Sequence, residues 1–263
     1  MWEFRFDLFA VFYFLGLYQT GNYAFAMGVV ALVCAWGPDT VLQVMLRSFM
    51  VRRYGAREDK EGLQKFFKIS TSAKLFFVIP TIVVLTVLIK PLAGVLFGAK
   101  YAGGITLFYI FAPFLLFKIM VSPLREVLIV LKRNDISFVS NWALLYKIAG
   151  IVILVPLYGI HALAFVSGSF FLIVFLVHYY FGRKVIAFEF EWGKIIKIAI
   201  NTAIAMVAGI VLLRVFTKNL MGIAGVAVAM MFVYGVASYG NKVFTREERA
   251  LFNEAIGRNL WVF

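Results

Sequence analysis

Long apolar runs, separated by short polar stretches, follow one another along most of the chain. Inside each run the hydrophobic positions are continuous and do not alternate with polar ones, which predicts helices and not the strands of a membrane β-barrel. One helical crossing of a bilayer needs roughly 20 apolar residues. We therefore predict an all-α polytopic membrane bundle of about eight spans, at residues 6–18, 23–46, 69–89, 105–131, 136–155, 160–182, 195–213 and 223–240.

The two ends of the chain need separate treatment. The first span is short and reaches an adequate length only if Trp2 and Phe4 belong to it. Residues 1–240 are predicted to form one transmembrane lobe, and residues 241–263 a cytoplasmic amphipathic tail. The tail contains Thr245-Arg246-Glu247-Glu248, a capping-box pattern that predicts the start of a helix lying on the membrane.

Composition supports the membrane assignment. Hydrophobic residues make up 63% of the 263 residues and charged residues only 15%, whereas a soluble domain is nearer half apolar. The single cysteine, Cys34, excludes an intrachain disulfide and a cysteine metal cluster. His161 and His178 fall at opposite ends of one span, which favours interfacial or packing roles over metal ligation. No metal site and no cofactor is predicted.

The basic residues orient the predicted spans. One set of loops holds Arg47, Arg52, Arg53, Arg57, Lys60, Lys65, Lys68, Arg125, Lys132, Arg133, Arg183, Lys184, Lys194, Lys197, Lys242, Arg246, Arg249 and Arg258; the opposite set holds only Lys90, Lys100, Arg214 and Lys218. The positive-inside rule places the first set in the cytoplasm, and both termini with it if the first segment spans. We expect a multi-pass protein of the cell (plasma or inner) membrane.

The net charge of +13 mostly reflects this topology. The basic residues are dispersed over several short loops, which favours contact with anionic membrane lipids and argues against nucleic acid as a partner.

Glycines and small residues recur at similar places in three spans. Gly21, Gly159 and Gly222 each precede a run of small residues, and we expect glycine to tighten the outer turn there. The pairs Ala164-x-x-x-Gly168, Ala205-x-x-x-Gly209 and Gly225-x-x-x-Ala229 predict faces on which neighbouring helices approach closely.

Several turn motifs also occur in a characteristic order. They are Gly21-Asn22-Tyr23-Ala24-Phe25-Ala26, Tyr54-Gly55-Ala56-Arg57, Pro91-Leu92 with Leu96-Phe97-Gly98-Ala99-Lys100-Tyr101, Leu131-Lys132-Arg133-Asn134-Asp135 and Pro156-Leu157-Tyr158-Gly159-Ile160. In this order they resemble the carboxy-terminal half of polysaccharide flippases of the multidrug/oligosaccharidyl-lipid/polysaccharide exporter superfamily. Met45-Leu46-Arg47-Ser48 departs from the family, which usually has a proline there.

The resemblance implies a fold and a function. It implies one lobe of a two-lobed exporter of about fourteen spans, and covers nearly all of this chain but only half of a family member. It implies alternating-access export of a polyprenyl-diphosphate-linked glycan through a polar, cationic cavity. It also implies that this half pairs with a separate second lobe, forms a homodimer, or is a truncated product of a longer protein.

Lysines at membrane depth are the first candidates for that cavity. Lys118 lies about 20 Å from either end of its predicted span and Lys147 about 12 Å from the outer end of its own. Each costs on the order of 2.5–3.5 kcal/mol at a helix centre unless water or an anion meets it. Substrate binding and snorkelling to an interface both remain open for this pair, and snorkelling is favoured for Lys74, which lies near the inner boundary.

Other charged residues have two interpretations each. Arg125 and Glu126 follow Ser122-Pro123 and form either a hinge at the cytoplasmic mouth, with Arg125 binding substrate, or an inner anchor with a local ion pair. Asp39 either pairs with a lysine or carries a coupling ion, and Glu126 is a candidate for the same roles. Alternatively, Asp39 belongs to a polar break in a helix kinked by proline. Asp7 and Arg5 are expected to pair with each other at the inner surface.

Two further side chains and two further function classes remain open. Asn141 and Asn201 either line a cavity or, as we favour, hydrogen-bond across helices. A multidrug or cation extruder of the same superfamily would favour more membrane acids than this sequence has, and a non-transporting structural or assembly subunit is a third possibility. An enzyme is not predicted, because no P-loop, metal-ligand spacing or Ser/His/Asp grouping is present.

Overall fold

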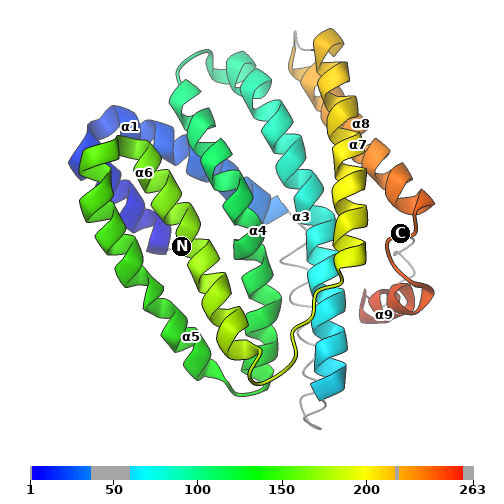
Figure 1. The fold of residues 1–263 in the computed structure, drawn as a ribbon. Helices are drawn as coiled ribbons and strands as arrows, with labels where there is room; N and C mark the ends of the chain where they lie inside the picture. Colours follow the sequence, from blue (N-terminus) through cyan, green and yellow to red (C-terminus); the bar gives the residue numbers. More distant parts are fainter. Residues whose placement is uncertain (1, 37–59, 217–218, 257–263) are drawn as a thin grey trace.

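The computed structural model describes residues 2–36, 60–216 and 219–256, and within these the chain is helical and contains no strand. Six of the described helices are long and apolar enough to cross a membrane. The prediction of an all-α polytopic helical bundle is confirmed (Figure 1). The helices are α1 (Trp2–Trp36), α3 (Lys60–Phe97), α4 (Ala102–Val130), α5 (Asn134–Asn141), α6 (Ala143–Gly182), α7 (Trp192–Phe216), α8 (Leu220–Gly240) and α9 (Arg246–Ile256).

Two of the long helices are in fact hairpins. In α1 the backbone leaves helical geometry at Gly16, with φ 80° and ψ 179°, and in α6 it does so at Gly159, with φ 66° and ψ −153°. A positive φ of this size is strained for residues with a side chain, so glycine permits each reversal within a single residue. Figure 1 shows both hairpins, and together they supply four antiparallel apolar segments.

The first reversal differs from the sequence-based expectation. It lies at Gly16, whereas Gly21 and Asn22 already belong to the second arm of the hairpin. Asn22 instead accepts a hydrogen bond from the Gly104 backbone N–H at 3.2 Å, which joins α1 to the start of α4. The expected role of Gly159 is confirmed, because that residue is the reversal point of α6.

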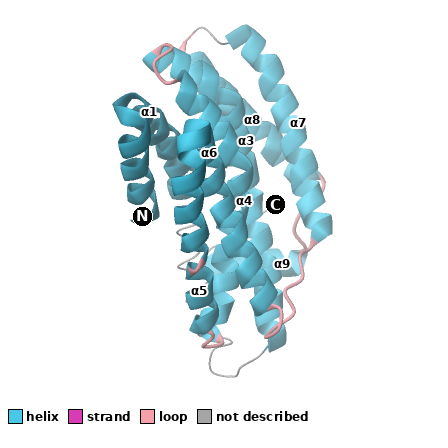
Figure 2. Ribbon diagram, turned by 60° about the vertical axis from the view of Figure 1, so that its left-hand side comes forward, coloured by secondary structure: helices cyan, strands magenta, loops and turns pink. Residues whose placement is uncertain are grey.

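Helix α4 lies inside the bundle, between α1 and α6 on one side and α3 on the other (Figures 1 and 2). Helices α7 and α8 pair with each other and pack on α3. The α3–α4 turn, the α6 reversal and the start of α8 lie at one end of the bundle, and the α4–α5 and α6–α7 connections lie at the other. This arrangement groups the connections as the basic-residue pattern groups them.

Close helix packing occurs at two of the three predicted small-residue faces. A Cβ added to Gly168 would lie 2.5 Å from the Phe114 ring of α4, and one added to Gly209 would lie 2.3 Å from Met230 of α8. A Cβ on Gly225 would meet nothing within 4 Å, so this glycine is not needed for packing in the described structure.

The predicted capping box begins α9. The Thr245 N–H donates to the Glu248 carboxylate at 2.9 Å, and the Glu248 N–H donates to the Thr245 hydroxyl at 3.3 Å. Glu248 also forms an ion pair with Lys194 near the start of α7, and Lys194 pairs with Glu191 at 2.6 Å. These contacts fix α9 against the bundle and confirm the pattern's prediction of a helix start.

Candidate functional site

A cavity of about 420 Å³ lies between α4, α5 and α6 and collects much of the polar chemistry of the membrane region. Its charged lining comes from α4, namely Lys118, Arg125 and Glu126. The rest of the lining includes Ser122 of α4, Ser140 and Asn141 of α5, and Phe170 and Phe171 of α6. Three predicted site residues therefore meet in one place.

Helical spacing explains why α4 presents these side chains together. Lys118, Ser122, Arg125 and Ile129 follow at intervals of four, three and four residues, which places them on one face of a helix. Pro123 lies inside the same stretch and lacks the backbone N–H that a helix interior normally uses. The sequence thus aligns two cations along the cavity wall.

Lys118 lies beside the aromatic part of the wall. Its Nζ is 5.0 Å from the centroid of the Phe171 ring, within the range of a cation–π contact. The side chain is only partly buried and belongs to the cavity lining. Of the two interpretations of Lys118, this position supports the cavity role.

Lys74 reaches the same region from α3. Its Nζ donates to the Ser122 hydroxyl at 2.7 Å and lies 3.9 Å from Glu126 Oε1. The Ser122 hydroxyl donates to the same carboxylate oxygen at 3.2 Å. Lys74 and Glu126 are 1% and 3% exposed, so the expectation that Lys74 snorkels to the inner boundary is wrong: a buried carboxylate holds it inside the bundle.

Glu126 therefore has a different partner from the one expected. Its ion pair in the described structure is with Lys74, on another helix, whereas its neighbour Arg125 is exposed and lines the cavity. Among the described lining residues, two cations, Lys118 and Arg125, stand against one carboxylate, Glu126, which Lys74 also contacts. Such a site is suited to bind an anion, and Arg125 can contact two oxygens of one phosphate group.

Lys147 lies outside this lining, in a buried polar cluster. Its Nζ is 2.8 Å from Asp7 Oδ1 and 2.9 Å from Asp7 Oδ2, and the two side chains are 3% and 0% exposed. Asp7 Oδ2 also accepts hydrogen bonds from the Tyr23 hydroxyl at 2.8 Å and the Ser167 hydroxyl at 3.0 Å. The cluster joins both arms of α1 to both arms of α6.

This cluster corrects two expectations. Asp7 pairs with Lys147 and is buried within the bundle instead of lying at an inner surface, and the side chain of Arg5, its expected partner, lies outside the described part of the structure. Lys147 is compensated by a carboxylate and does not face water. The position of Asp7 within an apolar run indicates that this acid needs a partner in the membrane. The sequence alone does not identify Lys147 as that partner, because the two residues are 140 positions apart.

The remaining predicted polar residues divide between the two roles considered for them. Asn141 lines the cavity. Asn201 donates to the Ser238 hydroxyl at 3.0 Å and exchanges hydrogen bonds with the Asn241 side chain, so it bonds across α7 and α8 as expected. Asp39 lies outside the described residues.

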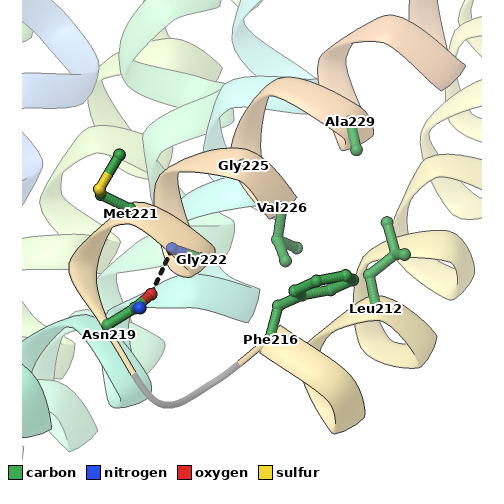
Figure 3. A pocket seen from close by; sticks show the side chains of 8 residues that line it. All are labelled: Leu212, Phe216, Asn219, Met221, Gly222, Gly225, Val226 and Ala229. Carbon is green, nitrogen blue, oxygen red and sulfur yellow. Dashed lines mark hydrogen bonds between the residues drawn. The ribbon is translucent and has the colours of Figure 1, made fainter.

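Two other cavities are less suited to a charged ligand. One, of about 490 Å³, lies between α7 and α8 and is mainly apolar (Figure 3). Its polar side chain, Asn219, already accepts a 2.7 Å hydrogen bond from the Gly222 N–H as the cap of α8. Another, of about 880 Å³, is an open groove between α3, α4 and α7 with Arg214 in its lining. Among the described residues no group of three or more His, Cys, Asp or Glu could hold a metal ion.

Comparison with known proteins yields one informative match. No protein-family model and no curated protein sequence matches the chain. Among solved structures, the chain is similar to the lipid II flippase MurJ in an inward closed conformation, with a TM-score of 0.67 and 16% sequence identity. The match covers 92% of this chain and 50% of the MurJ chain. The chain thus has a fold shared with half of a flippase, and it is a multi-pass membrane protein.

Proposed function

We propose that this chain is one lobe of a transporter that moves a lipid-linked glycan across the membrane. The substrate would carry a diphosphate between a polyprenyl chain and its sugars, as the motif resemblance implies. The similarity in fold to MurJ supports lipid-linked substrates in general. The polysaccharide character of the glycan rests on the motif resemblance alone.

The cavity between α4, α5 and α6 carries this proposal. A diphosphate crossing hydrocarbon needs cationic partners away from bulk water, and Lys118 and Arg125 supply two of them. A volume of about 420 Å³ lies within the range of sites that bind small molecules, on the order of 300–1,000 Å³. The polyprenyl chain would remain in the bilayer while the charged part occupies the cavity.

The chain spans half the length of the MurJ chain that it matches. Alternating access requires two bodies that move against each other, and we propose that a second lobe or a second copy of this chain provides the other body. The predicted location is the cell membrane, with both termini in the cytoplasm. Transport would involve no chemical change of the substrate, so the protein would not be an enzyme.

The surroundings of the membrane acids weigh against a cation extruder. Such a protein needs carboxylates available to a cationic substrate. Asp7 and Glu126, the acids found deep in the described bundle, each lie beside a lysine. Among the described lining residues of the cavity, cations outnumber carboxylates, which favours the anionic substrate.

Flipping in liposomes tests the proposal. The purified full chain would be reconstituted with a fluorescent polyprenyl-diphosphate glycan, and outward movement measured by quenching with an impermeant reductant. We expect Lys118→Ala to slow flipping at least about tenfold, since removing one partner of a buried charge interaction commonly costs 2–5 kcal/mol. Lys184→Ala, at an exposed loop lysine, is the matched control and should flip at the wild-type rate.

The outcomes separate a self-sufficient carrier from a half that needs a partner. Lysine-dependent flipping by the chain alone would support a functional homo-oligomer. If the folded chain binds the fluorescent lipid but does not flip it, a separate second lobe is required. If it neither binds nor flips the lipid, the proposed function is wrong.

A further inference from the structure

A single aromatic layer separates the Asp7–Lys147 pair from the cavity. Lys147 Nζ lies 5.4 Å from the centroid of Phe170, and Phe170 itself lines the cavity. The next ring along the chain, Phe171, has Lys118 beside it at 5.0 Å. The two rings pack edge to face with centroids 5.8 Å apart. Two lysines therefore contact adjacent rings of one pair, and the cavity lining includes Lys118 but not Lys147.

Helix geometry directs the Lys147 side chain toward the cavity. Lys147 of α6 follows Ser140, a cavity-lining residue of α5, by seven positions, and Trp142 between the two helices keeps helical backbone angles (φ −61°, ψ −20°). The two residues are therefore about two helical turns, or roughly 10 Å, apart on the same face. Helical side chains lean toward the helix N-terminus, which from Lys147 is the direction of Ser140. The lysine stem is long and flexible, so a rotation of its side chain together with that of Phe170 would bring the ammonium into the cavity.

Asp7 keeps hydrogen-bond partners when Lys147 moves. Its Oδ2 accepts from the Tyr23 and Ser167 hydroxyls as well as from the lysine. A buried carboxylate without any donor is very costly, but one with two hydroxyl donors is partly compensated. When Lys147 moves toward a diphosphate, its ammonium group exchanges the Asp7 carboxylate for the negatively charged ligand.

We propose that Lys147 is a third cation of the anion site, beside Lys118 and Arg125, and that Asp7 holds it behind Phe170 until a diphosphate occupies the cavity. This inference rests on the proposed function, because it assigns a further binding residue to the same site. Asp7 is a positioning residue in this scheme: it sets where the ammonium lies in the empty protein and competes with the ligand for it.

Titration with a short prenyl diphosphate tests the competition. Geranylgeranyl diphosphate would be titrated into the full-length protein in detergent, and the Kd measured by calorimetry. Asp7→Asn removes the competing charge, so we expect about tenfold tighter binding than wild type. Asp7→Asn/Lys147→Met should lose this gain completely. Equal Kd values for these two folded variants would overturn the inference.

A charge exchange covers the case in which Asp7→Asn does not fold. Asp7→Lys/Lys147→Asp keeps opposite charges in the cluster but places a carboxylate behind Phe170. The inference expects binding about tenfold weaker than wild type, because the new carboxylate repels the diphosphate. A purely structural ion pair would leave the Kd unchanged, and this result would overturn the inference.

Lys118→Ala separates failure of this inference from failure of the proposed function. If that variant loses binding while the Asp7 and Lys147 variants keep the wild-type Kd, the anion site stands and the role of Lys147 is wrong. If Lys118→Ala binds as wild type does, the cavity is not the diphosphate site and both proposals fail.

Discussion

Three lysines in the membrane region have three different surroundings. Lys147 is buried beside the Asp7 carboxylate. Lys74 of α3 contacts a serine and a carboxylate of α4, and Lys118 lies beside an aromatic ring at the cavity wall. An ammonium group is stabilised differently in each case. Substitution of each lysine should therefore affect stability and ligand binding in different proportions.

Removal of Lys147 should mainly affect stability. Lys147→Met leaves Asp7 buried without its counter-charge, and breaking a buried ion pair in this way costs about 3–5 kcal/mol. Thermal unfolding in detergent measures the loss. Lys100→Met, at an exposed turn, is the control and should unfold at nearly the wild-type temperature.

Removal of both partners should cost much less. In Asp7→Asn/Lys147→Met no charge remains to be compensated, so most of the lost stability should return. A double variant as unstable as Lys147→Met would contradict the assignment of the ion pair as the source of the effect.

At the scale of helices, glycine marks where two backbones approach. Gly168→Ala places a methyl group against the Phe114 ring and should destabilise the protein by about 1–3 kcal/mol through overpacking of α4 and α6. Gly225→Ala is the matched control, because it adds the same methyl group to open space. Thermal unfolding of both variants checks this, and equal losses would contradict it.

The loop between α6 and α7 is tied to α3 by a pair that depends on pH. Lys68 donates to Glu189 at 2.6 Å, and this hydrogen bond together with the lysine charge holds the pKa of the Glu189 carboxyl below its usual 4.5. A lowered folded-state pKa means that the stabilisation is present above the unfolded-state pKa and is lost as the pH falls through the folded-state value.

Glu189→Gln should reproduce this loss at neutral pH. We expect a small decrease in unfolding temperature at about pH 7, and this decrease should disappear as the pH falls through the folded-state pKa of Glu189, because the wild-type carboxyl then becomes protonated too. Lys68→Gln should give the same decrease at neutral pH, and Lys68→Gln/Glu189→Gln no further one. A difference between wild type and Glu189→Gln that persists in acid would exclude this pair as its cause.

Apolar periodicity predicted the helices well because a continuous run has one stable form in a bilayer. It misplaced the first reversal, because Gly21 lies in a polar stretch between Thr20 and Asn22 that is typical of a turn, whereas Gly16 lies between Leu15 and Leu17. In the structure Asn22 instead bonds to Gly104 at the start of α4. Lys118, Arg125 and Glu126 line one cavity because their spacing on α4 is local, although Glu126 was expected only as an ion-pair or coupling residue and Arg125 had an anchor role as its alternative. Lys74 and Lys147 were misjudged because their partners lie on other helices, at distances in sequence that no local pattern encodes.

At the scale of the whole molecule, we predict that loops at the two ends of the bundle lie on opposite sides of the membrane and differ in their access to an impermeant labelling reagent. In a Cys34→Ser background, Lys100→Cys in the α3–α4 turn should react with an impermeant maleimide added to intact cells, because that turn belongs to the loops with few basic residues. Lys132→Cys in the α4–α5 connection should react only after the cells are opened. The reverse pattern would invert the proposed orientation.

The distance in sequence between Asp7 and Lys147 also bears on how the protein is made. The two residues are 140 positions apart, so at about 5–20 residues per second the ribosome needs roughly 7–28 s to supply the ammonium after the carboxylate. Tyr23, only 16 positions from Asp7, is the donor available early. We therefore expect the first hairpin to enter the membrane with the Asp7 carboxylate bonded to the Tyr23 hydroxyl, and the ion pair with Lys147 to form later, once α6 has been made.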